Sequence, residues 1–118
     1  MPIKLVADLV AKAKTEIATL ALSEADAAHV DPDTPFVDNR DIRELKRDGR
    51  IPGAMHAPCG MLEFWVDPEC PYHKPELSSG KRLVLYCASG WRSALAVKTL
   101  QDMGVTNIRG LENGFSGW

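Results

Sequence analysis

One stretch of the sequence decides the fold, and it reads Leu83-Val84-Leu85-Tyr86-Cys87-Ala88-Ser89-Gly90-Trp91-Arg92-Ser93. Its first four residues form a continuous apolar, β-prone run of the kind that is buried on both faces of a parallel sheet. From Trp91 onward, apolar residues at helical spacing predict a helix that ends at Gly104. The stretch therefore predicts a strand, a tight loop and a helix. It places Cys87 at the carboxyl end of the strand, where ligands bind in α/β sheets.

Strand and helix patterns alternate along the rest of the chain. Apolar spacing predicts an opening helix, and a capping-box pattern at Ser23–Asp26 predicts a second, short helix that stops at Asp31-Pro32. The charge-rich segment 41–48 predicts a solvated helix capped by Asp41 and Glu44, with Ile42 and Leu45 facing inward. We expect helices at 6–17 and 41–48, strands at 36–38, 83–86 and 107–111, and a short helix with an extended loop at 60–77. This alternation predicts an α/β layered fold.

Length, charge and cysteine content limit the class of protein. The chain has 118 residues, enough for one domain, and its 14 Lys and Arg against 16 Asp and Glu give a net charge of −2. It therefore lacks the basic field of a nucleic-acid or anionic-membrane partner. The longest stretch without formal charge, Ile51–Leu62, contains two prolines and is too short to cross a bilayer. The three cysteines contain no C-x-x-C, and no signal peptide is evident, so we expect a cytoplasmic protein.

Cys87 is the candidate nucleophile. Backbone N–H groups in a loop that enters a helix, together with the helix dipole, form an anion site that favours a thiolate. Gly90 allows the turn, Arg92 supplies a planar cation for an oxyanion, and Ser93 adds a hydroxyl. The competing interpretation, an inert buried cysteine, explains none of these three residues.

The histidines do not provide an alternative route to an activated thiol. No local signature of a cysteine protease links Cys87 to His29, His56 or His73.

Four motifs resemble the rhodanese family of sulfurtransferases. Cys87–Ser93 resembles the active-site loop C-x-x-G-x-R-S, and Asp38-Asn39-Arg40 resembles the D-V-R after an early strand. Residues 51–54 are similar to the H-I-P-G-A turn, and residues 113–118 are similar to G-G-x-x-x-W. The chain departs from the family pattern at Asn39, Arg50 and Asn113.

The resemblance implies a single rhodanese-like domain with a central parallel β-sheet flanked by α-helices on both faces. Residues 23–118 would form its core and residues 1–22 a helical extension. It also implies a sulfurtransferase in which Cys87 takes the outer sulfur of a donor such as thiosulfate as a persulfide and passes it to a thiol or cyanide, without a cofactor or metal. Cys87 and Arg92 would be catalytic, and Asp38 and Arg40 would support the loop. The residues expected to line the substrate site are Ala88, Ser89, Gly90, Trp91 and Ser93.

Three other interpretations remain open. The first is a non-catalytic persulfide carrier or redox-sensing module with the same loop. The second is a cysteine phosphatase, but its pattern C-x-x-x-x-x-R is one residue longer than the Cys87–Arg92 loop. The third is a metal site, and its residues match no structural zinc spacing: Cys59, Cys70, His73 and Cys87.

Overall fold

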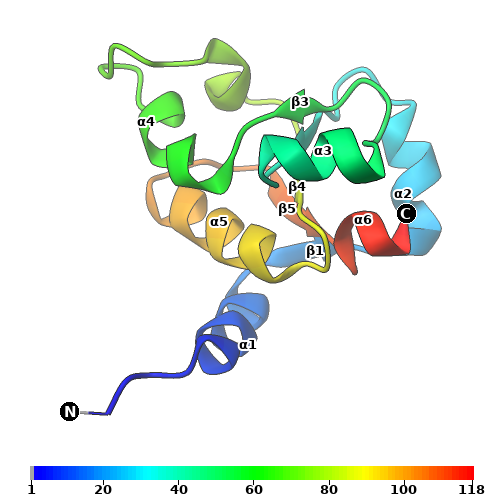
Figure 1. Ribbon diagram of the computed structural model, residues 1–118. Coiled ribbons are helices and arrows are strands. Elements are labelled where there is room, and N and C mark those ends of the chain that lie inside the picture. The colour runs from blue at the N-terminus through cyan, green and yellow to red at the C-terminus, as the bar shows by residue number, and fades with distance from the viewer. Residues whose placement is uncertain (1) are drawn as a thin grey trace.

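β4 (Leu83–Tyr86) lies at the centre of a five-stranded sheet in the computed structural model, which describes residues 2–118 (Figure 1). The strand order is β1-β5-β4-β2-β3, and every neighbouring pair is parallel. The other strands are β1 (Ala18–Leu20), β2 (Phe36–Asp38), β3 (Met55–His56) and β5 (Ile108–Leu111). The predicted α/β fold with a central parallel sheet is thus confirmed.

Helices cover both faces of this sheet. They are α1 (Val6–Glu16), α2 (Leu22–His29), α3 (Ile42–Asp48), α4 (Leu62–Val66), α5 (Trp91–Asp102) and α6 (Gly114–Gly117), with 3-10 turns η1 (Cys59–Met61) and η2 (Pro75–Ser78). The α1 helix packs against α5, and the chain before α1 extends away from the body (Figure 1). Within residues 2–118, none of the helices has the length and apolar character needed to cross a membrane.

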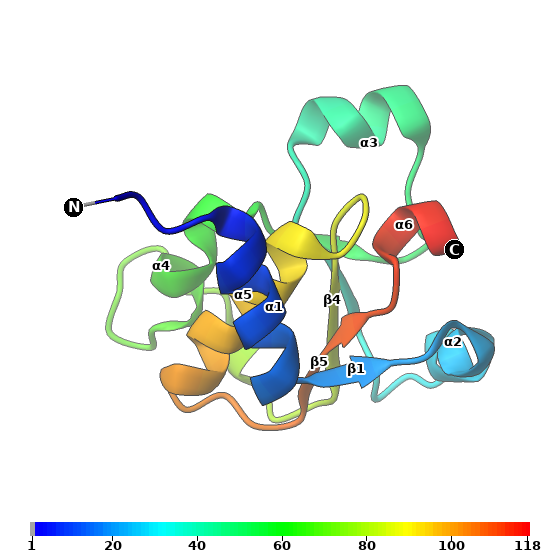
Figure 2. The same ribbon diagram turned by 90° about the horizontal axis from the view of Figure 1, so that it is seen from below.

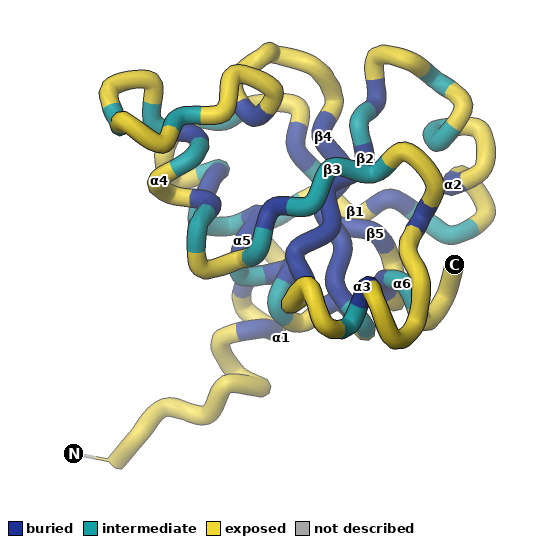
Figure 3. The backbone as a smooth tube through the Cα atoms, turned by 45° about the horizontal axis from the view of Figure 1, so that its top comes forward, coloured by how far each residue is buried: buried dark blue, intermediate teal, exposed yellow. Residues whose placement is uncertain are grey.

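The side chains of β4 divide the core into two layers. Successive residues of a strand point to opposite faces, so Leu83 and Leu85 pack in one cluster, with Val97 and Leu100 of α5. Val84 and Tyr86 pack in a second cluster, on the face that receives residues of α2 and α6. The strands β2, β4 and β5 accordingly form the buried centre of the molecule (Figure 3).

The described part of the expected helical extension 1–22, residues 2–22, is not purely helical. These residues include β1, which pairs with β5 at the edge of the sheet and buries Leu20. The α2 helix begins at Leu22, and its N-cap residue is Ala21, whose side chain makes no capping hydrogen bond. The prediction of a capping box that begins at Ser23 is therefore wrong. The Leu22 amide instead donates to Oε2 of Glu112 at 3.0 Å, a partner far away in the sequence.

The carboxyl edge of the sheet carries the loop from Cys87 to Gly90, with α3 and α6 beyond it (Figure 2). The predicted Asp41–Glu44 capping box of α3 is confirmed, and Leu45 is buried as expected. The prediction that Ile42 faces inward is wrong, because 46% of its surface is exposed. The α3 helix thus rests on the body through a narrow contact and keeps its charged side chains accessible.

Candidate active site

Backbone and hydroxyl groups surround the sulfur of Cys87. The amide N–H groups of Gly90 and Ser93 donate to Sγ at 3.2 Å and 3.4 Å, and the Ser93 hydroxyl oxygen lies 3.5 Å from it. Gly90 has φ = 101°, a conformation that side chains other than glycine's rarely adopt. The loop turns at this glycine and brings the start of α5 against the sulfur.

These donors favour the thiolate. Burial alone raises the pKa of the Cys87 thiol. The Ser93 side chain and the amides of Ser93, Gly90 and Ser89 together lower the pKa by more than burial raises it, so the net shift is downward. Hydrogen bonds to a charged form stabilise that form. The loop therefore favours a thiolate at Cys87 through its own amide and hydroxyl groups.

A reactive cysteine at the carboxyl end of a strand is expected to face a pocket open to solvent, but the sulfur of Cys87 does not open directly to solvent. Cys87 is only 1% exposed. Two cavities of about 210 Å³ flank the loop, one lined by Gly90 and Ser93 and the other by Cys59 and Arg92. Trp91, expected to line the substrate site, is half exposed on the first turn of α5.

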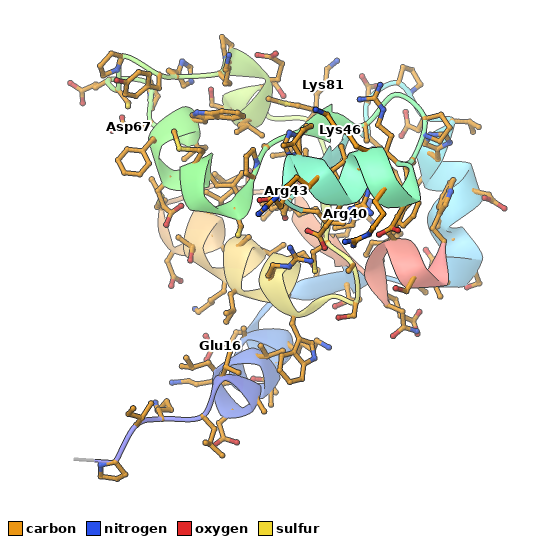
Figure 4. The ribbon with its side chains drawn as sticks, viewed as in Figure 1. Glu16, Arg40, Arg43, Lys46, Asp67 and Lys81 are labelled. Atoms are coloured by element: carbon orange, nitrogen blue, oxygen red, sulfur yellow. The ribbon has the colours of Figure 1, made fainter. Side chains whose placement is uncertain are left out.

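A larger cavity, of about 350 Å³, lies at the other end of β4. It is lined by Leu83, the first residue of that strand, and by Asp67 and Lys81, both of which are labelled in Figure 4. The carboxyl end of β4, which carries Cys87, is not part of it. This cavity therefore lies away from Cys87.

Arg92 is paired with a carboxylate that the sequence did not indicate as its partner. Its two terminal nitrogens donate to the two carboxylate oxygens of Glu44 on α3, at 2.7 Å and 2.9 Å. The guanidinium lowers the pKa of Glu44 to about 2, and the carboxylate raises the pKa of Arg92. The sequence predicts only a capping role for Glu44, because no local pattern indicates that it pairs with a residue 48 positions away.

Asp38 and Arg40 form a buried pair beneath the loop. The Arg40 guanidinium donates to the Asp38 carboxylate at 2.8 Å and to the carbonyl oxygen of Gly49, also at 2.8 Å. It lies 4.3 Å from the ring centre of Phe115. Arg40 lies in the turn before α3, and the α3 helix itself carries Arg43 and Lys46 (Figure 4). This pair joins the end of β2 to the end of α3 and to α6, whereas a supporting role toward the loop stays a prediction.

The α6 helix packs against the backbone at the start of the loop and forms hydrogen bonds with it. The amide of Phe115 donates to the carbonyl oxygen of Cys87 at 2.8 Å, and the amide of Ser116 donates to that of Ala88 at 2.9 Å. The motif at residues 113–118 indicated a family resemblance but gave no role for these amides. They fix the backbone of the two residues that begin the loop.

The cysteines and histidine of the metal alternative are dispersed. Cys59 is exposed and Cys70 is half-buried, whereas Cys87 is buried. In the described part of the chain, no three His, Cys, Asp or Glu side chains are grouped to hold a metal ion.

Comparisons with known proteins point to one family. The family model described as Rhodanese-like domain matches residues 21–118. A relative from Bacillus subtilis (strain 168), named "Putative sulfur carrier protein YrkF", is 29% identical over 97 residues, which are 80% of this chain and 48% of that protein. The chain thus spans about half the length of this relative.

Two solved structures extend the comparison. A protein from Rhodopseudomonas palustris CGA009, described as of unknown function and as a "Possible Tyrosine Phosphatase", has 45% identity and a TM-score of 0.92, covering 100% of this chain and 93% of that one. A rhodanese-related protein from Thermoplasma volcanium has 26% identity and a TM-score of 0.61, covering 86% of this chain and 89% of that one.

Proposed function

Because the chain belongs to the family of rhodanese-like domains, we propose that it is a sulfurtransferase that carries sulfane sulfur as a persulfide on Cys87. The observation that carries this proposal is the pair of backbone N–H groups, from Gly90 and Ser93, that donate to Sγ, with the Ser93 hydroxyl in contact with the same atom. They stabilise a negative charge on Sγ, which is present in the thiolate that attacks the donor and in the thiolate that leaves when the persulfide gives up its outer sulfur.

The reaction has two steps. In the first, the Cys87 thiolate attacks the outer sulfur of a donor such as thiosulfate, the sulfur–sulfur bond of the donor breaks, and sulfite leaves with the bonding electron pair. In the second, a thiol or cyanide attacks the outer sulfur of the persulfide, and the Cys87 thiolate leaves. With cyanide the product is thiocyanate. The loop amides face the same sulfur in both steps, so one cradle serves attack and release.

A carrier function is the second candidate. The name of the Bacillus subtilis relative describes sulfur carriage, and the same persulfide would then be passed to a protein partner instead of turned over with small molecules. Multiple turnovers with thiosulfate and cyanide support the sulfurtransferase. A single stoichiometric loading without turnover supports the carrier.

A phosphatase function is the third candidate, because of the description given to the Rhodopseudomonas palustris structure. Four residues separate Cys87 from Arg92, and both inward amides converge on one sulfur atom. The guanidinium of Arg92 is directed to Glu44 instead of to a phosphate position above the loop. Hydrolysis of p-nitrophenyl phosphate by the wild type, lost in Cys87→Ser, would favour this function over sulfur transfer.

Mass spectrometry of the intact protein tests the proposal. After treatment with thiosulfate, the wild type should gain the mass of one sulfur atom, and cyanide or dithiothreitol should remove it. Cys87→Ser should gain nothing, whereas Cys59→Ser should still be loaded. A Cys87→Ser protein that took up sulfur would contradict the proposal.

A further inference from the structure

Glu44 neutralises the cation that the active-site loop carries. The Arg92 guanidinium donates one hydrogen bond to each oxygen of the Glu44 carboxylate, at 2.7 Å and 2.9 Å. Bidentate arginine–carboxylate pairs of this kind are stronger and more directional than single contacts. A donor that approaches Cys87 therefore meets a neutral pair in place of a free positive charge.

The carboxylate is held in place by its own helix. Oε2 of Glu44 also accepts from the amide of Asp41 at 2.9 Å, as part of the capping box, and the adjacent Leu45 is buried. The Glu44 side chain is 19% exposed and the Arg92 side chain 39%. Freeing the guanidinium for a substrate anion would mean breaking both hydrogen bonds of a preorganised pair.

Two further cations of α3, Arg43 and Arg47, are also paired. Arg43 contacts Asp41 at 2.9 Å and Arg47 contacts Asp48 at 2.9 Å. These side chains surround the open surface that Arg92 and Glu44 share. The three arginines that line this surface are thus each paired with a carboxylate, which weakens the positive field that would draw in a dianion.

The loop itself can stabilise one negative charge. The amides of Gly90 and Ser93 converge on the Cys87 sulfur, so the thiolate or persulfide uses them. We infer that Glu44 determines donor specificity by holding Arg92, so that the protein disfavours dianionic donors such as thiosulfate and favours donors with at most one negative charge, above all organic persulfides. This inference rests on the proposed function and names its substrate class.

Sulfur transfer from an organic persulfide to Cys87 involves one negative charge among the reactants and one among the products. The Cys87 thiolate attacks the outer sulfur of R–S–SH, the sulfur–sulfur bond breaks, and RS⁻ leaves with the electron pair while the proton stays on the transferred sulfur. One negative charge enters and one leaves. Thiosulfate instead brings two charges to the thiolate and releases sulfite with two.

A matched pair of donors tests the inference. Methanethiosulfonate and thiosulfate both present a terminal sulfane sulfur on an oxidised sulfur, but methanethiosulfonate has a methyl group in place of one anionic oxygen. With cyanide as acceptor, the wild type should show a kcat/KM at least about tenfold higher for methanethiosulfonate, and added salt should narrow the difference. Glu44→Gln should reduce the preference about tenfold, chiefly through a lower KM for thiosulfate.

Two variants separate specificity from structure. Glu44→Asp retains the charge and should keep most of the wild-type preference. Asp102→Asn also removes one carboxylate, but that carboxylate lies at the end of α5, where it pairs with Lys98 outside the surface that Arg92 and Glu44 share, so the donor preference should not change. Melting temperatures verify that each variant is folded.

The outcomes are distinct. If Glu44→Gln changes kcat/KM for both donors by the same factor, Glu44 only caps α3, and the inference is overturned. A wild type that prefers thiosulfate overturns it as well. If neither donor loads Cys87 in the wild type, the proposed function itself fails, and the inference fails with it.

Discussion

Gly114 lies directly against the backbone of Cys87. A Cβ at residue 114 would overlap the carbonyl oxygen of Cys87 and would lie 3.0 Å from the carbonyl oxygen of Ala88. Gly114 also has a positive φ of 55°. The beginning of α6 and the end of β4 can approach this closely only because residue 114 has no side chain.

Gly114→Ala should therefore damage both stability and sulfur transfer, although no reacting group is changed. We expect the free energy of unfolding to fall by at least about 2 kcal/mol, since both the backbone conformation and the contact become strained. Denaturant unfolding and thiosulfate turnover measure the two effects. Gly60→Ala is the control, because a Cβ at residue 60 meets nothing within 4 Å. Equal stability of the two variants would contradict the prediction.

Ser93→Ala should shift the pH dependence of sulfur transfer. The Ser93 hydroxyl helps to lower the pKa of Cys87, so its removal raises that pKa and leaves less thiolate at neutral pH. We expect kcat/KM to fall about three- to tenfold near pH 7 and to recover at higher pH, because a net hydrogen bond to a charged group is lost.

The measurement is a pH profile of kcat/KM for the wild type and Ser93→Ala, whose rising limb should move to higher pH. Ser79→Ala, an exposed hydroxyl outside the loop, should leave the profile unchanged. A uniform loss of rate at every pH would mean that Ser93 does not act through the Cys87 pKa.

Asp38→Asn should destabilise the protein strongly. Asp38 and Arg40 are 0% and 1% exposed, and the substitution leaves the Arg40 guanidinium buried beside a neutral amide. Breaking one partner of a buried pair costs about 3–5 kcal/mol. Urea unfolding should show a loss in this range, against less than about 1 kcal/mol for Asp48→Asn, whose ion pair is exposed. Comparable losses in the two variants would refute the bracing role of Asp38.

The three cysteines should differ sharply in their importance for turnover. Cys87→Ser should abolish sulfur transfer while the fold is retained, because the substitution is small. Cys59→Ser and Cys70→Ser should keep most of the activity, since no loop amide contacts their sulfur atoms in the hydrogen bonds of the described residues. Steady-state thiosulfate turnover distinguishes them. A large loss in Cys59→Ser would instead indicate that a second thiol takes part.

The sequence predicts best where a local pattern carries the information. The apolar run at 83–86 and the helical spacing after Trp91 correctly predicted β4 and α5, and Asp41 with Glu44 correctly predicted the cap of α3. β1 and β3 have three and two residues, too few for any periodicity to emerge. They exist because longer neighbouring strands supply their hydrogen bonds.

The candidate site was predictable in part for the same reason. Gly90 and Ser93 lie within one loop, and their donors reach the sulfur as the loop pattern indicates. The Arg92–Glu44 pair depends on where α3 lies over the sheet edge, and Cys87 is buried by elements that come from other parts of the chain. No spacing along the sequence encodes either relationship.

The brevity of β1 and β3 also bears on how copies of the chain behave toward one another. Both edges of the sheet end in these strands, so each edge offers only two or three residues of unpaired backbone to another molecule. Edge-to-edge pairing, the usual beginning of β-aggregation, needs a longer template. The shortness of these two edge strands thus limits edge-to-edge pairing between the sheets of two copies.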